Sequence, residues 1–253
     1  MDDSPPRRPT GPAASVRTAV VWEVVLAALA ELGLGRTGRL VVVDAGGGTG
    51  GFAVPLAQAG HRVTVVDPSP DSLAALQRRA AEQDLEVEAL QGDLADLPQL
   101  LEPASADLVL CHSVLEVVED PAAALADVAG LLRPGGRLSL LVANRDAAVL
   151  ARALAGRPDE AARVLTDPAG RWGAADGVAH RWTLSALSEA VTGAGLHVEQ
   201  VHGVRTVADL VPSAVLDTEP GSAAALLALE RTLSARSPFR DVATQLHLLA
   251  VQP

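Results

Sequence analysis

The chain has 253 residues, of which 49% are hydrophobic, and a formal net charge of −11 at pH 7. This length is ample for one large domain with a real core, and the acidic balance argues against a general nucleic-acid binder. Long apolar stretches and a signal-peptide pattern are both missing, and Cys111 is the single cysteine, so we expect a cytoplasmic protein without disulfides or a membrane partner.

Helical and strand patterns alternate along the first part of the chain. Residues 1–12 read as a disordered tail, and apolar periodicity then predicts a helix over 13–32. Strands are predicted at 40–43, 61–67, 85–90, 106–111 and 137–143, and the helices between them at 52–59, 70–83 and 122–132. This pattern is typical of a parallel, doubly wound sheet.

The alternation stops at residues 145–181, which we interpret as a helical cap inserted after a core of residues 13–144. That segment holds six Arg and five acidic residues, a net of +1, so the rest of the chain carries −12. Residues 182–253 complete the core, with helices predicted at 183–192 and 223–234 and strands at 196–202 and 242–251. The expected fold class is therefore α/β, with a mostly parallel seven-stranded sheet and a cap.

The loop Asp44-Ala-Gly-Gly-Gly-Thr-Gly50 follows the first predicted strand. A loop with so few side chains lets a ligand lie against backbone N–H groups at a helix N-terminus. Its spacing fits both the acidic, glycine-alternating pattern of S-adenosylmethionine (SAM) binders and, as Gly46-x-Gly48-x-x-Gly51, the dinucleotide fingerprint. The plain alternative is a glycine-rich turn that binds nothing.

Three features favour SAM. They are the helix before the first strand, the segment Cys111 to Pro121, and Leu131-Leu132-Arg133-Pro134-Gly135-Gly136-Arg137-Leu138 leading into strand five. Together they resemble the class I SAM-dependent methyltransferases. The resemblance implies a Rossmann-like fold, SAM as cofactor and S-adenosylhomocysteine (SAH) as product. An NAD-dependent oxidoreductase and a non-catalytic SAM binder are the alternatives.

A finer resemblance extends from about residue 13 to 253. Five segments are similar to one subfamily of these enzymes. They are Arg17 to Trp22, His112-x-Val114-Leu115-Glu116, the Asn144 region, Gly203-Val204-Arg205 and the segment 226–249. That subfamily methylates the carboxylate of 5-carboxymethoxyuridine at the wobble position of tRNA. The segment 145–181 departs from its lysine-rich cap, and the body is more acidic. The methyl acceptor therefore stays open between tRNA and a small metabolite.

Candidate cofactor residues follow from the pattern and the resemblance. Asp67 ends the second strand, where a carboxylate can accept from both ribose hydroxyls, although it could instead cap the next helix. The others are Asp44 to orient the loop, Gly46, Gly47 and Gly48 to approach the methionine moiety, Asp93 and Leu94 for the adenine, Arg17 for the cofactor carboxylate, and His112 beside the cofactor. No metal is expected.

Candidate acceptor residues depend on the chemistry. A carboxylate acceptor is ionised at neutral pH and needs no base, and Arg205 could hold it by a bidentate pair. A hydroxyl or amine would need a base, for which His112, His180 or a carboxylate could serve. Asn144 is the single asparagine in a chain without Lys, Ile or Tyr, so we expect it to have a specific role on the acceptor side.

Overall fold

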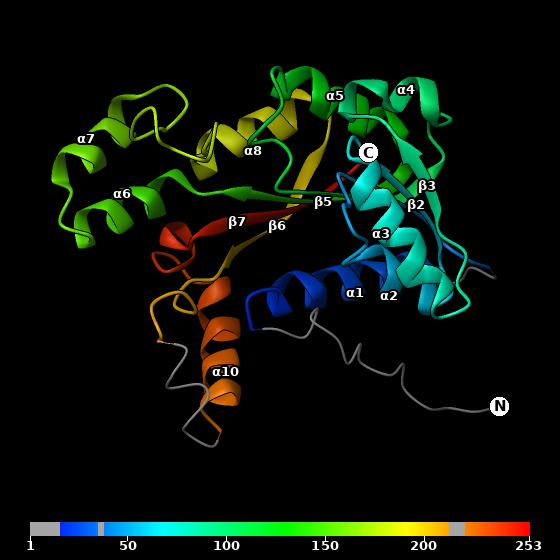
Figure 1. The fold of residues 1–253 in the computed structure, drawn as a ribbon, viewed down its shortest axis with the longest axis horizontal. Coiled ribbons are helices and arrows are strands. Elements are labelled where there is room, and N and C mark those ends of the chain that lie inside the picture. Colours follow the sequence, from blue (N-terminus) through cyan, green and yellow to red (C-terminus); the bar gives the residue numbers. More distant parts are fainter. Residues whose placement is uncertain (1–15, 35–37, 213–220) are drawn as a thin grey trace.

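The computed structural model describes residues 16–34, 38–212 and 221–253, so the expected tail at 1–12 lies outside the described residues. Seven strands form one sheet in the order β3-β2-β1-β4-β5-β7-β6 (Figure 1). The strands are β1 Val41–Ala45, β2 Arg62–Asp67, β3 Glu88–Gln91, β4 Ala106–His112, β5 Leu132–Ala143, β6 His197–Val204 and β7 Gln245–Val251. Only β7 runs antiparallel to its two neighbours. The predicted doubly wound, mostly parallel sheet is therefore confirmed.

Helices cover both faces of this sheet (Figure 1). Two hydrophobic cores lie between the helices and the sheet. In one, the sheet packs against α1 Ala19–Gly33, α2 Ala53–Gln58 and α3 Pro70–Ala81. In the other, it packs against α4 Leu97–Leu100, α5 Pro121–Leu131 and α8 Leu184–Gly193. Helix α10 Ser222–Ser234 lies beside α1. Among the described residues, no helix combines the length and apolarity needed to cross a bilayer.

Local sequence explains where these elements begin. Ser69 caps α3 by accepting the N–H of Ser72, and Asp120 caps α5 by accepting the N–H groups of Ala122 and Ala123. A proline follows each cap at the first helical position, where it needs no hydrogen-bond partner for nitrogen. Both caps place a turn at the carboxyl end of a strand, which is where parallel sheets bind ligands.

Several predicted boundaries were wrong. Helix α1 begins at Ala19 rather than residue 13, and β3 begins at Glu88 rather than Leu85. Strand β5 begins at Leu132, five residues earlier than expected. Two contacts hold this part of the chain against β4: Arg133 pairs with Asp107, and Gly136 lies so close to Ala106 that a Cβ on Gly136 would be 2.9 Å from the Ala106 carbonyl oxygen. The last strand begins at Gln245 rather than Val242, since residues 240–242 form a 3₁₀ helix. The short helix α4 was not predicted.

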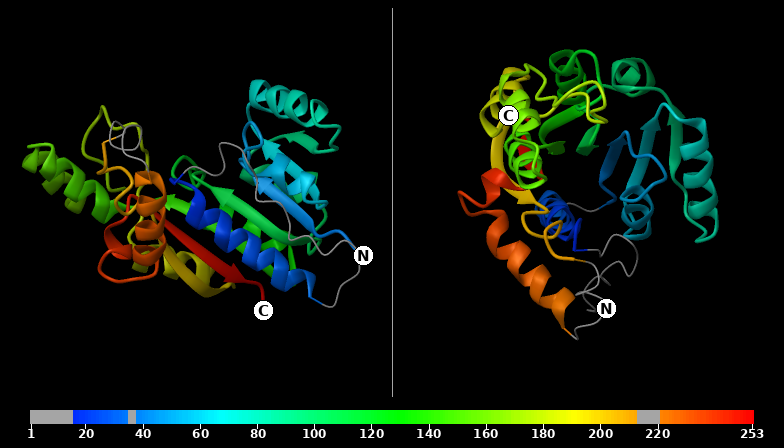
Figure 2. Two further views of the ribbon diagram at one scale, coloured as in Figure 1. Left: turned by 90° about the horizontal axis from the view of Figure 1, so that it is seen from below. Right: turned by 60° about the vertical axis from the view of Figure 1, so that its left-hand side comes forward.

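The predicted cap contains α6 Arg145–Leu154 and α7 Pro158–Thr166 and projects beyond the end of β5 and the start of β7 (Figures 1 and 2). It joins the sheet through a narrow neck. Trp182 N–H donates to the Ala143 carbonyl at 2.9 Å, and Arg145 N–H donates to the Trp182 carbonyl at 2.9 Å. The chain therefore enters and leaves the cap at adjacent positions.

Candidate active site

The glycine loop is tied to the end of β2. Gly46 and Gly48 have positive φ angles of 79° and 54°, which a glycine adopts without strain. The Gly46 N–H donates to the Val66 carbonyl at 2.7 Å, and the Gly48 N–H donates to Asp67 Oδ2 at 2.9 Å. Asp67 Oδ1 accepts the Ser69 N–H at 2.9 Å. Each carboxylate oxygen keeps a second lone pair, so Asp67 can still accept from a ribose hydroxyl.

Asp44 lies under this loop, inside β1. Its side chain is buried, and a Cβ on Gly47 would lie 2.6 Å from Asp44 Oδ2. Burial, and then the negative charge of Asp67, raise the pKa of Asp44 to about 7. A positively charged ligand above the loop would favour the ionised form of Asp44. The site therefore fits the sulfonium and amino groups of SAM.

A pocket of about 530 Å³ opens beside the loop, between β1, β3 and the segment after β4. Gly46, Asp93, Leu94 and Val114 are among its lining residues. Asp93 caps the 3₁₀ helix Leu94–Asp96 by accepting the Ala95 N–H at 2.8 Å, and this fixes its carboxylate at the rim. The lining combines apolar side chains with the carboxylates of Asp93, Glu119, Asp120 and Asp127, and Asp93 next to Leu94 suits an adenine amine beside its ring. We call this the cofactor pocket.

A second pocket, of about 450 Å³, lies between the sheet and the cap. Its polar lining includes Arg152, Arg181 and Arg205, which come from α6, the end of the cap and the segment after β6. Glu116 and Gln245 also line it, and Val117 lines both this pocket and the cofactor pocket. We call it the acceptor-side pocket, because it adjoins the place where the cofactor's methyl group is expected.

His112 takes part in a buried chain of hydrogen bonds across the sheet. Its Nε2 lies 2.9 Å from Ser139 Oγ, which lies 2.8 Å from His247 Nε2. Its ring also meets Phe52 edge-on, with centroids 4.7 Å apart. Burial lowers the pKa of His112 to about 3, so the ring is neutral at physiological pH and a poor general base. It is not among the residues that line either pocket.

Two of the predicted arginines share one carboxylate. Asp209 Oδ2 lies 2.6 Å from Arg205 Nη2, and Asp209 Oδ1 lies 3.5 Å from Arg17 Nε. The Arg17 side chain is 65% exposed and lines neither pocket, whereas Arg205 lines the acceptor-side pocket. Asp209 was not predicted, since only the fold brings the loop after β6 to the start of α1.

Asn144 lines the acceptor-side pocket, but its polar atoms are already bonded. Its amide nitrogen donates to the carbonyls of Asp241 at 2.9 Å and Ala243 at 2.7 Å, and its Oδ1 accepts the Asp146 N–H at 3.0 Å. The side chain thus caps α6 and fixes it to the chain before β7. The single asparagine therefore has a positional role, which was not predicted, and its predicted role on the acceptor side stays a prediction.

His180 packs edge-on against Trp182, with ring centroids 4.6 Å apart, and is not among the residues lining the acceptor-side pocket. Burial, and then the nearby Arg145, lower its pKa.

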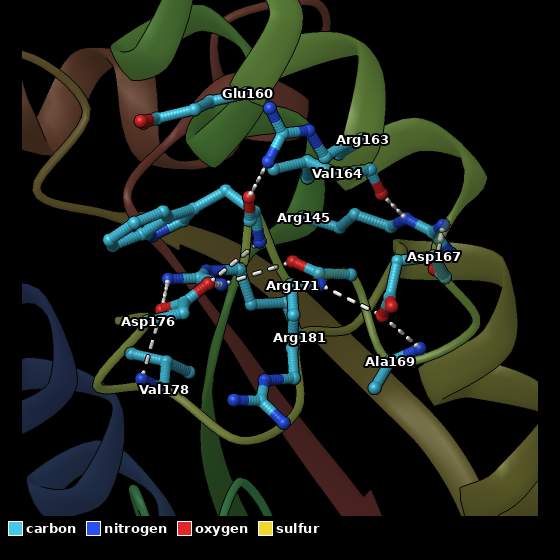
Figure 3. Close-up of polar contacts among 12 residues, drawn as sticks. Arg145, Glu160, Arg163, Val164, Asp167, Ala169, Arg171, Asp176, Val178 and Arg181 are labelled. Carbon is cyan, nitrogen blue, oxygen red and sulfur yellow. Dashed lines mark hydrogen bonds and ion pairs between the residues drawn. The ribbon is translucent and has the colours of Figure 1, made fainter. Parts of the chain in front are cut away.

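The cap arginines bind mainly within the cap (Figure 3). Arg145 donates to the Val164 and Leu165 carbonyls at 2.8 Å each, near the end of α7. Arg181 forms a bidentate pair with the buried Asp176, at 2.6 and 2.9 Å. Arg152 pairs with Glu160 and stacks on Trp172, 4.4 Å from the ring centroid. Much of the predicted positive charge of the cap is therefore neutralised locally.

Glu116 is a site residue that the sequence indicated only as part of a motif. Its side chain is 7% exposed, and Oε1 accepts the Ala143 N–H at 2.8 Å. Burial raises its pKa, against the effect of the backbone N–H groups of Glu116 and Ala143. Within the described ranges, three or more His, Cys, Asp or Glu side chains do not gather anywhere in an arrangement that could hold a metal ion.

Comparisons with known proteins agree with this geometry. Residues 43–140 match the family described as Methyltransferase domain. The tRNA 5-carboxymethoxyuridine methyltransferase of Escherichia coli (strain K12) is 34% identical over 146 residues, covering 57% of this chain and 54% of that protein. A ubiquinone biosynthesis O-methyltransferase of Xylella fastidiosa (strain 9a5c) is 33% identical over 168 residues, covering 65% and 63%. The chain thus spans only about half to two-thirds of these curated relatives.

The fold is shared with solved methyltransferases. The magnesium protoporphyrin IX methyltransferase of Synechocystis PCC 6803 with bound SAH superposes with a TM-score of 0.60 at 20% identity, over 94% of this chain and 84% of that chain. Sheet order, glycine loop and family match lead to one assignment: the chain carries a class I methyltransferase domain, and SAM is its cofactor.

Proposed function

We propose that the protein transfers the methyl group of SAM to a carboxylate oxygen, and that the acceptor is a 5-carboxymethoxyuridine at the wobble position of tRNA. The main support is the acceptor-side pocket, next to the cofactor pocket, because its lining residues include Arg152, Arg181 and Arg205. The similarity to the tRNA enzyme, over 146 residues, supports the same acceptor.

The cofactor half is assigned by position. SAM, when bound, supplies a methyl carbon that its positive sulfur already activates. Asp67 would accept from the ribose hydroxyls, Asp93 from the adenine amine, and Leu94 would pack on the ring. The Gly46–Gly48 backbone would follow the methionine moiety above Asp44. Arg17 would turn from Asp209 to the cofactor carboxylate, which costs little because an exposed ion pair contributes little.

The acceptor half needs no proton transfer. A carboxylate is ionised at neutral pH, so the protein has only to align it and exclude water. Arg205 would hold one end of the acceptor by a bidentate pair. His112, which lines neither pocket, would stay neutral and would not act as a base. Asn144 would fix the wall of the pocket, and His180 would lie behind it against Trp182.

The proposal is tested with methyl-labelled SAM and total tRNA from a GC-rich bacterium. We expect label on tRNA that mild alkali removes, because a methyl ester hydrolyses readily and an ether or N-methyl group does not. Alkali-stable label would contradict a carboxylate acceptor. Absence of label from a protein that binds SAH would contradict tRNA as the substrate.

The ribose assignment has its own test. We expect Asp67→Ala to weaken SAH binding about tenfold or more, which corresponds to loss of a charge-assisted hydrogen bond. Asp71→Ala, an exposed carboxylate in the first turn of α3, is the matched control. Unchanged SAH affinity in Asp67→Ala would rule out the ribose contact.

One observation favours a second candidate, O-methylation of a small metabolite. The net charge is −11, and several cap arginines bind carboxylates or carbonyls of the cap itself. A polyanion such as tRNA then finds fewer free cations than the sequence suggests. If tRNA takes no label, the same assay with a small-molecule extract would test this candidate.

A further inference from the structure

Two residues that line the acceptor-side pocket each have a buried side-chain atom without a hydrogen-bond partner, and the two atoms are of opposite kinds. Glu116 Oε2 is an acceptor, and Arg205 Nε is a donor. The two side chains come from different strands: Glu116 follows β4, and Arg205 follows β6. They are not paired with each other, since Glu116 contacts the Ala143 N–H and Arg205 contacts Asp209.

Unpartnered buried polar atoms are uncommon, because each loses its contact with water and gains nothing in return. One such atom can reflect a local packing compromise. An unpartnered acceptor and an unpartnered donor on two residues that line one pocket of about 450 Å³ instead match a ligand that carries the complementary groups.

We propose that the pocket recognises its acceptor at two points: Arg205 binds an anionic group, and Glu116 accepts a hydrogen bond from an N–H or O–H of the same molecule. This rests on the proposed function and narrows it. In 5-carboxymethoxyuridine the carboxylate is the anionic group, and the ring N3–H is the donor. Glu116 is then a specificity-determining residue.

The surroundings of Glu116 suit this role. The Ala143 N–H fixes one carboxylate oxygen at 2.8 Å, so the other is held in one place. An incoming N–H would stabilise the ionised carboxylate that burial disfavours. An acceptor with a carboxylate but no donor would leave Glu116 Oε2 without a hydrogen-bond partner. A site built in this way rejects such an analogue strongly.

The test compares two synthetic stem-loop RNAs, one with 5-carboxymethoxyuridine in its loop and one with the N3-methylated form of that nucleoside. Binding to the full chain is measured in saturating SAH. We expect the wild type to prefer the N3–H RNA by about tenfold or more, as for a hydrogen bond to a charged group. Glu116→Gln keeps the size and the Ala143 contact, and we expect it to reduce the preference to below about threefold.

Three measurements control the comparison. Glu189→Gln, an exposed carboxylate on α8, should keep the wild-type preference. Arg205→Ala should weaken the binding of both RNAs by similar factors, since both carry the carboxylate. SAH affinity should be unchanged in Glu116→Gln, because Glu116 is not among the residues lining the cofactor pocket, and this reports correct folding.

Equal wild-type binding of the two RNAs would overturn the two-point proposal and leave the tRNA proposal standing. An unaltered preference in Glu116→Gln would also overturn it. If the wild-type protein binds SAH but neither RNA, tRNA is not the acceptor, and the two-point recognition of this nucleoside is refuted as well.

Discussion

Replacing Asp176 with asparagine is expected to destabilise the protein by about 3 kcal/mol, the cost of leaving one member of a buried ion pair without its partner. The Asp176 side chain is 1% exposed and accepts four hydrogen bonds. Two come from the Trp172 and Val178 N–H groups at 3.0 Å each, and two from Arg181. Asparagine would keep some of the backbone contacts but leave Arg181 without its counter-charge.

The pKa of this carboxyl gives a second route to the magnitude. Burial raises the pKa, but the Arg181 guanidinium and the two backbone N–H groups outweigh it and lower the pKa from 3.8 to about 2. Since one pKa unit corresponds to about 1.4 kcal/mol, the ionised form contributes about 2 kcal/mol. Because the folded pKa is the lower one, this contribution is present above about pH 4 and is lost as the pH falls toward 2.

Urea unfolding between pH 3 and pH 7 measures both effects. The difference between wild type and Asp176→Asn should be constant from pH 7 to about pH 4 and smaller at pH 3. Asp159→Asn, an exposed cap carboxylate in α7, should change stability by less than about 0.5 kcal/mol. A cost below about 1 kcal/mol, or a difference that does not shrink with acid, would refute the argument.

Three other changes have expected outcomes. Arg145→Lys should cost about 1–2 kcal/mol in urea unfolding, because an ammonium cannot reach the Val164 and Leu165 carbonyls with a planar fork, whereas the exposed Arg78→Lys should be neutral. Gly203→Ala should destabilise the protein by about 1–3 kcal/mol, since the new Cβ would lie 2.8 Å from the Arg240 backbone. The control is Gly193→Ala, whose Cβ would meet no atom within 4 Å, so it should be neutral or stabilising. Equal melting temperatures for the two variants would contradict this prediction. Asp44→Asn should flatten the pH dependence of the ligand-free protein. Because the folded pKa of Asp44 is raised to about 7, the wild type loses stability as the pH rises from about 4 to 7. If the melting temperatures of the wild type and Asp44→Asn changed equally between pH 5 and pH 8, the reasoning would be wrong.

The sequence predicted the sheet because its signals were local. The run Leu40 to Val43 and the segment before Asp67 are apolar and β-branched, and glycine or proline marks where most neighbouring helices stop and start. The start of the last strand was not a local matter. The carbonyls of Asp241 and Ala243 accept from the Asn144 side chain, far away in the chain, so the ladder begins only at Gln245.

The residues of the candidate site also fall into those that local sequence signals place and those that distant contacts place. The glycine loop, Asp67 and Asp93 follow the ends of strands, so their positions could be inferred from strand order alone. Glu116 and Asp209 acquire their roles through contacts between segments that are distant in sequence, Ala143 for Glu116 and Arg205 with Arg17 for Asp209. The internal pairing of the cap arginines likewise depends on how α6 and α7 pack.

The neck at Ala143, Arg145 and Trp182 has a consequence for how this enzyme class could diversify. The chain leaves and re-enters the sheet at neighbouring, hydrogen-bonded positions, and α6 also contacts residues 240–242 of the core. Insertions of that kind are tolerated well. Exchanging residues 145–181 for another segment would change two of the three arginines that line the acceptor-side pocket while leaving the glycine loop untouched, so the composition of this pocket could be changed by replacing one segment.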